Sequence, residues 1–233
     1  MKKNRYNHLN TYLKNRFGER TLKVCIDGGF SCPNRDGKVG FGGCAFCGRL
    51  GAGENLKNRK EEVLESIESQ ILGFLNSYRG ERANKFIAYF QNFTNTYDSL
   101  ENLKARYDSA LIDNRIVCLA IATRPDCITE DICQLIASYK QKLDVWVELG
   151  LQTSNDETGK IINRRYSSSQ FTNAVYLLNK YNIDIVTHIM LGLPNETFDD
   201  IKNTVEFINN HHIQGLKILS CYVVDNTVLG EMY

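Results

Sequence analysis

The sequence predicts an α/β fold, a partial (β/α)6 TIM-like barrel with parallel strands. Strand-like runs rich in Val, Ile and aromatic residues alternate about six times with helix-like runs that have one apolar face. No internal repeat, low-complexity segment or linker separates a second domain. Because a parallel sheet needs a right-handed helical crossover after each strand, this alternation favours a closed or partly closed barrel. An open doubly wound sheet is the alternative.

Six apolar runs are the predicted buried strands. They are residues 22–27, 86–91, 116–122, 144–151, 183–191 and 216–224. The predicted helices between them are residues 60–78, 100–112, 129–140, 169–181 and 197–210. Thr129 and Thr197 are each followed by acidic residues in the first turn, so both are predicted N-caps.

Composition limits the class of protein. The 233 residues, 42% of them apolar, predict one large domain over 1–233, with 1–20 as an N-terminal extension. A formal charge of +1 gives no global reason to bind nucleic acid or an anionic membrane surface. The basic start has no apolar core of a signal peptide, and no run is long enough to span a membrane. We therefore expect a cytoplasmic protein with reduced thiols or metal ligands among its eight cysteines.

One loop after the first predicted strand concentrates soft ligands and glycine. Cys32, Cys44 and Cys47 have the spacing C-x11-C-x2-C, and glycines stand at 37, 40, 42, 43 and 48. Two residues between the last two cysteines let both sulfurs reach one inorganic centre, while glycine lets the backbone wrap around it. A [4Fe–4S] cluster held by three thiolates leaves one iron open, and catalysis by a metal needs such an open position.

A zinc site is the alternative for this loop. Structural zinc needs four protein ligands, and His8, Cys25 or Cys127 could supply the fourth. The other cysteines are predicted to be ordinary buried thiols. They are Cys25, Cys118, Cys133 and Cys221.

Taken with the fold, the loop resembles the radical S-adenosylmethionine (radical SAM) superfamily, whose usual spacing C-x3-C-x2-C is narrower. The stretch IDGGFSCPNRDGKVGFGGCAFC closely resembles its YhcC-like branch, which is related to Elongator-type and coproporphyrinogen-oxidase-type proteins. The stretches YFQNFTNTY, ATRPDCI, VELGLQT, IINR and HIMLGLPNET match that branch in order. The resemblance implies a cluster on Cys32, Cys44 and Cys47 that cleaves S-adenosylmethionine reductively to a 5′-deoxyadenosyl radical, with flavodoxin or ferredoxin as electron donor.

The resemblance also implies contacts to S-adenosylmethionine. Gln91 and Asn92 stand where relatives meet the methionyl amine, although the usual glycines are absent here. Gln152 corresponds to an adenosine contact and Arg164 to an arginine that pairs with the methionyl carboxylate. The branch usually has NRGH where this chain has Arg164 followed by Arg165 and Tyr166.

Three further polar residues are candidates for the same site. Arg124 ends the third strand beside Pro125, where a solvated or ion-paired charge is the alternative. Glu148 lies in an apolar run, and an ionised carboxylate there needs a polar cavity or a partner. His188 is a core histidine on pattern alone, but the resemblance places it against the adenosine ribose.

The sequence leaves the substrate open. Modification of RNA, in particular tRNA, is an alternative that the Elongator-type resemblance raises and the neutral charge does not support. A non-catalytic metal or redox-sensing module is another. Relatives of this branch commonly continue with a C-terminal extension, which we expect to be absent because the sequence stops just beyond the sixth strand.

Overall fold

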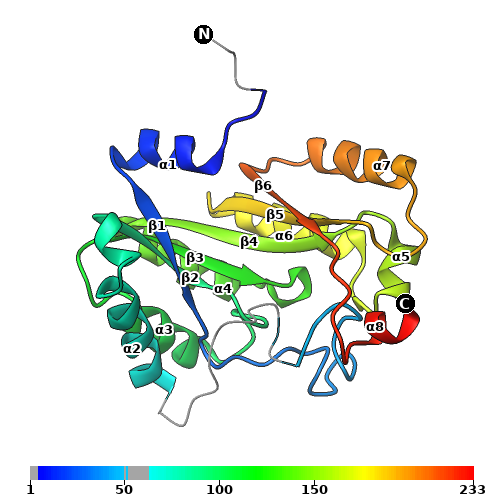
Figure 1. The fold of residues 1–233 in the computed structure, drawn as a ribbon, viewed down its shortest axis with the longest axis horizontal. Helices are drawn as coiled ribbons and strands as arrows, with labels where there is room; N and C mark the ends of the chain where they lie inside the picture. The colour runs from blue at the N-terminus through cyan, green and yellow to red at the C-terminus, as the bar shows by residue number, and fades with distance from the viewer. Residues whose placement is uncertain (1–4, 50, 52–62) are drawn as a thin grey trace.

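The computed structural model describes residues 5–49, 51 and 63–233. Its six strands form one parallel sheet in the order of the sequence, which curls into a half-barrel with β1 and β6 at its two edges (Figure 1). The strands are β1 (Thr21–Ile26), β2 (Lys85–Phe90), β3 (Ile116–Thr123), β4 (Asp144–Gln152), β5 (Asp184–Leu191) and β6 (Gly215–Ser220). A doubly wound sheet would reverse its strand order at a switch point, so that alternative is wrong.

Helices follow the strands and cover the convex face of the sheet. They are α2 (Val63–Leu75), α3 (Leu100–Ser109), α4 (Glu130–Ser138), α6 (Ser168–Lys180) and α7 (Phe198–Asn209). The five predicted helices are confirmed to within a few residues, except that 60–62 lie outside the described residues. Both predicted N-caps are confirmed, because Thr129 accepts a hydrogen bond from the Ile132 N–H and Thr197 forms a reciprocal capping box with Asp200.

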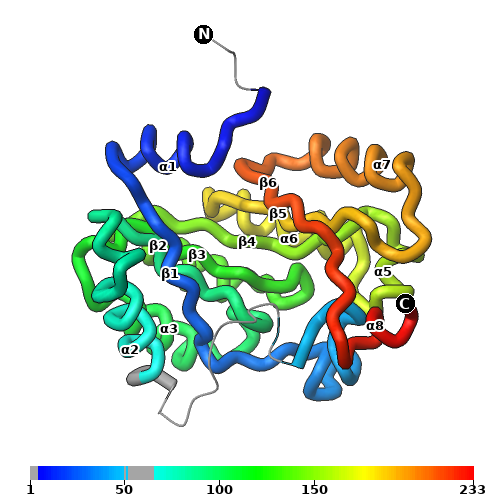
Figure 2. The backbone as a smooth tube through the Cα atoms, viewed as in Figure 1, coloured from blue at the N-terminus to red at the C-terminus, as the bar shows by residue number. Residues whose placement is uncertain are grey.

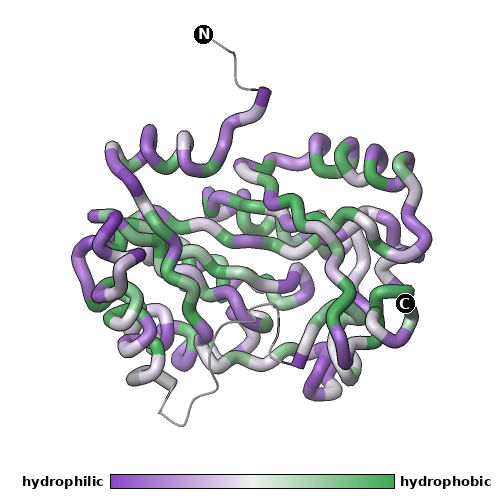
Figure 3. Tube along the Cα trace, in the orientation of Figure 1, coloured by the Kyte–Doolittle hydropathy of each residue, from purple (hydrophilic) through white to green (hydrophobic). Residues whose placement is uncertain are grey.

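The main core lies between the sheet and these helices. Alternate strand residues such as Val24, Phe86 and Phe90 point to the convex side and pack with Ile67 and Ile71 of α2. Each is at most 1% exposed. Burying one such side chain contributes about 1.5–3 kcal/mol, so this layer stabilises the half-barrel. Figure 3 shows the contrast between apolar strands and the hydrophilic outer turns of the helices.

A helix that the sequence did not predict closes the amino edge of the sheet. In α1 (Leu9–Phe17), Leu13 is 3% exposed and packs with Phe17, Ile87 and Trp146 on the concave side. Residues 9–17 are therefore part of the fold rather than only an extension. Figure 2 shows α1 at one edge of the strands and the loop after β1, together with α8 (Val228–Met232), at the other.

The sixth predicted strand is wrong in its last four residues. β6 ends at Ser220 because its partner β5 ends at Leu191, the residue paired with it. Cys221 therefore lies beyond the strand and is only partly buried, and Cys25 is exposed rather than buried. The short helix α5 (Asp156–Ile161) was also not predicted. Within the described part of the chain, no helix combines the length and apolarity that crossing a membrane requires.

Candidate active site at the carboxyl edge of the sheet

The loop that carries the three cysteines is a compact series of turns. The Arg35 N–H donates to the carbonyl of Cys32 over 2.8 Å, and the Cys47 N–H donates to the carbonyl of Cys44 over 2.9 Å. Gly43 has a φ of +87°, and a Cβ there would lie 2.9 Å from the Arg35 Nε. The left-handed backbone favours glycine at this position, and a Cβ would also displace the guanidinium.

Side chains and backbone from distant segments hold this loop. Asn34 is fully buried, and its Nδ2 lies 3.8 Å from the Cys44 Sγ while donating over 2.7 Å to a backbone carbonyl after α5. Between the last two cysteines, the Ala45 N–H donates to the Ile162 carbonyl, and the Ala45 carbonyl accepts from Leu229 of α8, each over 2.9 Å. The Cys44–Cys47 turn is thus fixed from two sides.

The three thiols influence one another electrostatically. Burial raises the pKa of Cys44 to about 12, while nearby Arg124 lowers it and the other two thiols raise it further. Burial also raises the pKa of Cys47, and Arg35 opposes that shift. Because a metal binds the thiolate, occupation of this loop must release protons.

The donor set fits a cluster better than a single ion. Among residues 5–49, 51 and 63–233, no three His, Cys, Asp or Glu side chains lie close enough together to ligate one metal ion. An iron-sulfur cluster spreads its cysteine ligands over separate irons, so three thiols on one loop suit it. Of the proposed fourth zinc ligands, His8 caps α1 at the opposite edge and Cys25 is exposed on β1. Cys127 is buried, which raises its pKa, and the charge of nearby Cys32 raises that pKa further, so it is the one proposed fourth ligand close to the loop.

Buried oxygens without hydrogen-bond donors gather at the same edge of the sheet. After β2 these are the Asn92 Oδ1, the Thr94 Oγ1 and the Asn95 Oδ1, and at the end of β4 the Gln152 Oε1. Gln152 also has a φ of +67°, unusual for a residue other than glycine. An unpaired buried acceptor costs about 1–3 kcal/mol, so these atoms fit a ligand that carries N–H or O–H donors. Gln91 lies beside them, its N–H bonded to Ile26.

The two candidate arginines are committed to partners within the chain. Arg124 is 7% exposed and pairs with Asp126 over 2.9 and 2.7 Å, and its charge also acts on Cys44. Arg164 is fully buried, pairs with Asp156 over 2.6 Å and donates to three backbone carbonyls. Both guanidinium groups lie 4.8 Å from the Tyr166 ring. The geometry gives both arginines a role in holding loops, and the carboxylate contact implied for Arg164 stays a prediction.

Glu148 and His188 come together, but on the concave face below the edge. The Glu148 carboxylate, 1% exposed, lies 2.7 Å from the His188 Nε2 and 3.5 Å from the Lys217 Nζ, and it also accepts from Lys23. Burial alone would raise the pKa of Glu148, but His188 and the two lysines hold it well below its usual range. Burial lowers the pKa of His188 despite its bond to the carboxylate. Sequence reasoning missed both lysines. The feature that could have indicated them is a charged residue inside an otherwise apolar strand.

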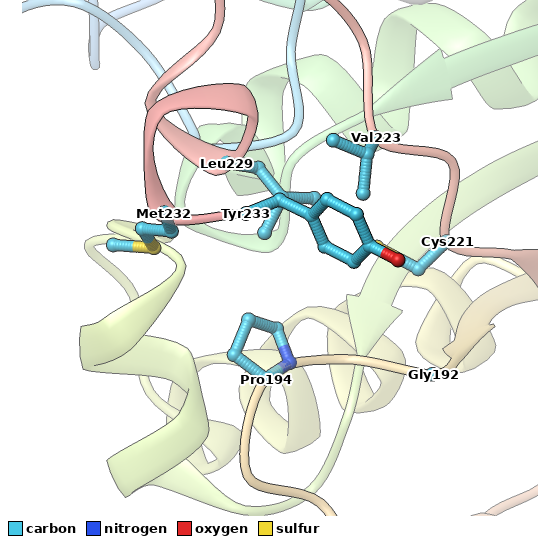
Figure 4. Close-up of a pocket in the computed structure, with 7 residues that line it drawn as sticks. All are labelled: Gly192, Pro194, Cys221, Val223, Leu229, Met232 and Tyr233. Atoms are coloured by element: carbon cyan, nitrogen blue, oxygen red, sulfur yellow. The ribbon is translucent and has the colours of Figure 1, made fainter.

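An apolar pocket of about 580 Å³ lies beside these loops (Figure 4). The turn after β5 lines one side of it, and the segment from the end of β6 through α8 lines the rest. Its lining residues are Gly192, Pro194, Cys221, Val223, Leu229, Met232 and Tyr233.

Comparison with known families matches residues 32–208 to the radical SAM superfamily. The chain belongs to that superfamily. It is therefore an enzyme of unspecified reaction rather than the non-catalytic module left open by the sequence. Members of the superfamily generally use S-adenosylmethionine and a [4Fe–4S] cluster, which agrees with the donor set of the cysteine loop.

Relatives place the chain in the YhcC-like branch. It is 37% identical to the uncharacterized protein YtqA of Bacillus subtilis over 98% of this chain and 70% of that protein. It is 32% identical to the protein YhcC of Escherichia coli over 95% of this chain and 70% of YhcC. A more distant relative, 32% identical over 52% of this chain and 22% of its own length, is a tRNA uridine(34) acetyltransferase of Methanocaldococcus infernus.

Solved structures confirm the fold. The archaeal Elp3 of Methanocaldococcus infernus superposes with a TM-score of 0.62 at 20% identity over 91% of this chain. Coproporphyrinogen III oxidase (HemN) of Escherichia coli, a radical SAM enzyme, superposes with a TM-score of 0.58 at 16% identity over 94% of this chain. The chain spans 48% of each of these solved chains.

Proposed function

We propose that Cys32, Cys44 and Cys47 hold a [4Fe–4S] cluster and that the protein uses it to cleave S-adenosylmethionine. The observation that carries this proposal is the place of the three thiols. They lie on one loop at the carboxyl edge of a parallel half-barrel, the edge where such folds build their sites. The same edge holds buried acceptors without donors, which match a ligand rich in amino and hydroxyl groups.

The chain's own residues would bind and orient the cofactors. When bound, the cluster would supply the electron that cleaves S-adenosylmethionine to a 5′-deoxyadenosyl radical. The Asn34 amide would donate to the Cys44 sulfur, a type of contact that sets cluster potentials. The side-chain oxygens of Asn92 and Gln152 would accept from amino groups of S-adenosylmethionine. The covered convex face and α1 at the amino edge would keep bulk water from the concave face on those two sides.

Anaerobic reconstitution tests this proposal. We expect about four irons per chain, as one [4Fe–4S] cluster requires, and a change in the electron paramagnetic resonance signal when S-adenosylmethionine is added. Dithionite with S-adenosylmethionine should then yield 5′-deoxyadenosine. Cys44→Ala should lose most of the iron, whereas the control Cys133→Ala, a buried cysteine on α4, should retain it. Equal iron in both variants, or an unchanged signal with S-adenosylmethionine, would overturn the proposal.

Modification of tRNA is the second candidate for the reaction. The observation that favours it is the similarity over 52% of this chain to the tRNA uridine(34) acetyltransferase. Fluorescence anisotropy with labelled tRNA at two salt concentrations tests it, since contacts to phosphates weaken steeply with salt. Saturable, salt-sensitive binding by the reconstituted protein would support an RNA substrate. Absence of binding at low salt would remove this candidate.

A further inference from the structure

A layer of polar side chains crosses the middle of the concave face. We call it the lumen layer, and it comprises Lys23 of β1, Tyr89 of β2, Glu148 of β4, His188 of β5 and Lys217 of β6. The Lys217 Nζ donates to the Tyr89 hydroxyl over 3.1 Å, and the Lys23 Nζ lies 4.3 Å from the Tyr89 ring centroid. Side chains of both edge strands therefore meet over the central strands.

Positive charge is in excess in the lumen layer. Glu148 is the one carboxylate among the described charges that act on Lys217, and it faces two ammonium groups. Its oxygens already accept from Lys23, Trp146 and His188. His188 does not offset the excess, because burial lowers its pKa and leaves the ring neutral near pH 7. Burial likewise lowers the pKa of Lys217, the cost of an ammonium group without a full counter-charge.

The concave face offers space toward the carboxyl edge. The side chains of Lys217 and Lys23 are 36% and 23% exposed, and Cys25, two residues beyond Lys23, is exposed. On the central strands this face carries small residues, including Ala120 and Ala122 of β3. Above Glu148, the space beside Gly150 of β4 is taken by the Gln152 amide and the Tyr166 hydroxyl, so the room lies toward the edge strands.

The lumen layer is covered at the amino edge of the sheet. Lys217 stands three residues before the end of β6, so the lumen layer lies about 10 Å below the carboxyl edge at the usual rise along a strand. At the opposite edge, α1 places Leu13 and Phe17 under the layer. A ligand entering from the carboxyl edge would pass the cysteine loop before it reached the ammonium groups.

We propose that the lumen layer binds an anionic group of the substrate, a carboxylate or a phosphate, through the ammonium groups of Lys217 and Lys23. The bound anion would balance the charge of the layer, and the Tyr89 hydroxyl would lie beside it. The name substrate rests on the proposed radical SAM function, whereas the preference for an anion rests on the lumen layer alone.

Cys25 reports the charge of this space. In the reconstituted protein without S-adenosylmethionine, we compare its alkylation by anionic iodoacetate and neutral iodoacetamide, resolved by peptide mass mapping. Both reagents attack the same thiolate, so their rate ratio cancels the pKa of the thiol. We expect a ratio several-fold higher at Cys25 than at Cys221, and a several-fold decrease in Lys217→Met. The matched control is Lys202→Met, which removes an exposed lysine on α7 and should leave the ratio unchanged.

Protection identifies the anion. At constant ionic strength, inorganic phosphate or succinate should slow iodoacetamide labelling of Cys25 relative to chloride, and the better protector assigns phosphate or carboxylate. Protection should disappear in Lys217→Met. An unchanged reagent ratio in Lys217→Met, or equal protection by chloride, would overturn the inference.

If that variant does not fold, Lys217→Gln is the second neutral variant, and Lys217→Arg should preserve the ratio. Iron analysis of the same samples separates failure of the cluster from failure of this inference, because the labelling needs no iron.

Discussion

The lumen layer and the carboxyl edge differ in which hydrogen-bonding groups lack partners. In the lumen layer both oxygens of the buried Glu148 carboxylate accept hydrogen bonds, and ammonium donors remain in excess. At the carboxyl edge the side-chain oxygens of Asn92 and Gln152 are buried without donors. The two regions lie on one face of one sheet but need opposite partners. An excess of donors suits an anion, and unpaired acceptors suit amino and hydroxyl groups. Two different ligands, a substrate below and a cofactor above, would satisfy both.

The backbone differs between these regions as well. Phe93, Gln152, Asn163, Arg165 and Asn195, all after or at the carboxyl ends of strands, have positive φ values between 52° and 67°. No residue of the lumen layer does. Such conformations cost free energy and persist at sites where the surrounding structure holds them. Left-handed backbone conformations therefore accompany the carboxyl edge, whereas the lumen layer is built on regular strands.

The largest expected effect comes from removing the one carboxylate charge of the lumen layer. Glu148→Gln leaves two ammonium groups without their carboxylate, so we expect a loss of about 3–5 kcal/mol in the free energy of unfolding, typical for removing one partner of a buried pair. Urea denaturation of the variant and the wild type measures it. A loss within about 0.5 kcal/mol, the range of ordinary surface substitutions, would show that solvent screens the layer.

The second prediction separates folding stability from cofactor affinity at the carboxyl edge. Gln152→Met removes an unpaired acceptor, so stability should stay unchanged or rise, while affinity for S-adenosylmethionine falls about tenfold, the worth of a hydrogen bond of about 1.4 kcal/mol. Calorimetric titration of the reconstituted protein provides the affinity. Gln134→Met on the exposed side of α4 is the control and should alter neither property. Equal affinities in both variants would remove Gln152 from the site.

A third prediction concerns acid. His188 has a folded pKa below that of the unfolded chain, so the unfolded state binds more protons as pH falls through about 6.5, and stability should decrease. Glu148 acts in the same direction at lower pH, because its folded pKa is also depressed. Denaturation midpoints from pH 8 to 5 measure the slope. His188→Gln should flatten the upper part of the curve, and an unchanged slope would mean that other groups cause it.

The smallest expected effect is at the strained turn after α5. Arg165→Gly places glycine at a φ of +65° and should stabilise the fold by about 0.5–1 kcal/mol, because relief of the left-handed strain outweighs the added freedom of the unfolded chain. The comparison is Asn182→Gly at the amino edge, whose φ is +54°. Asparagine tolerates this region, so its gain should be smaller. Thermal unfolding of both variants measures the two gains in stability. A larger gain for Asn182→Gly than for Arg165→Gly would contradict the strain explanation.

The sequence by itself determined the local features of this protein. Apolar periodicity predicted the strands and the convex-face helices, and hydroxyl residues before acidic turns predicted the caps at Thr129 and Thr197. Spacing and glycine content placed Cys32, Cys44 and Cys47 on one loop after β1. These features depend on residues close together in the chain, where periodicity and backbone preference act directly.

Only the tertiary structure decided which distant groups meet. Lys23 and Lys217 reach Glu148 from 125 and 69 residues away, and pattern alone gave neither lysine a role. Likewise, α1 is polar on most of its surface, and its place shows only when Leu13 packs beneath the sheet. Arg164 became a clamp on backbone carbonyls because β4 and the loop after it surround its guanidinium. Long-range packing brings such groups together, and the free energy of each charge depends on the partners that the fold supplies.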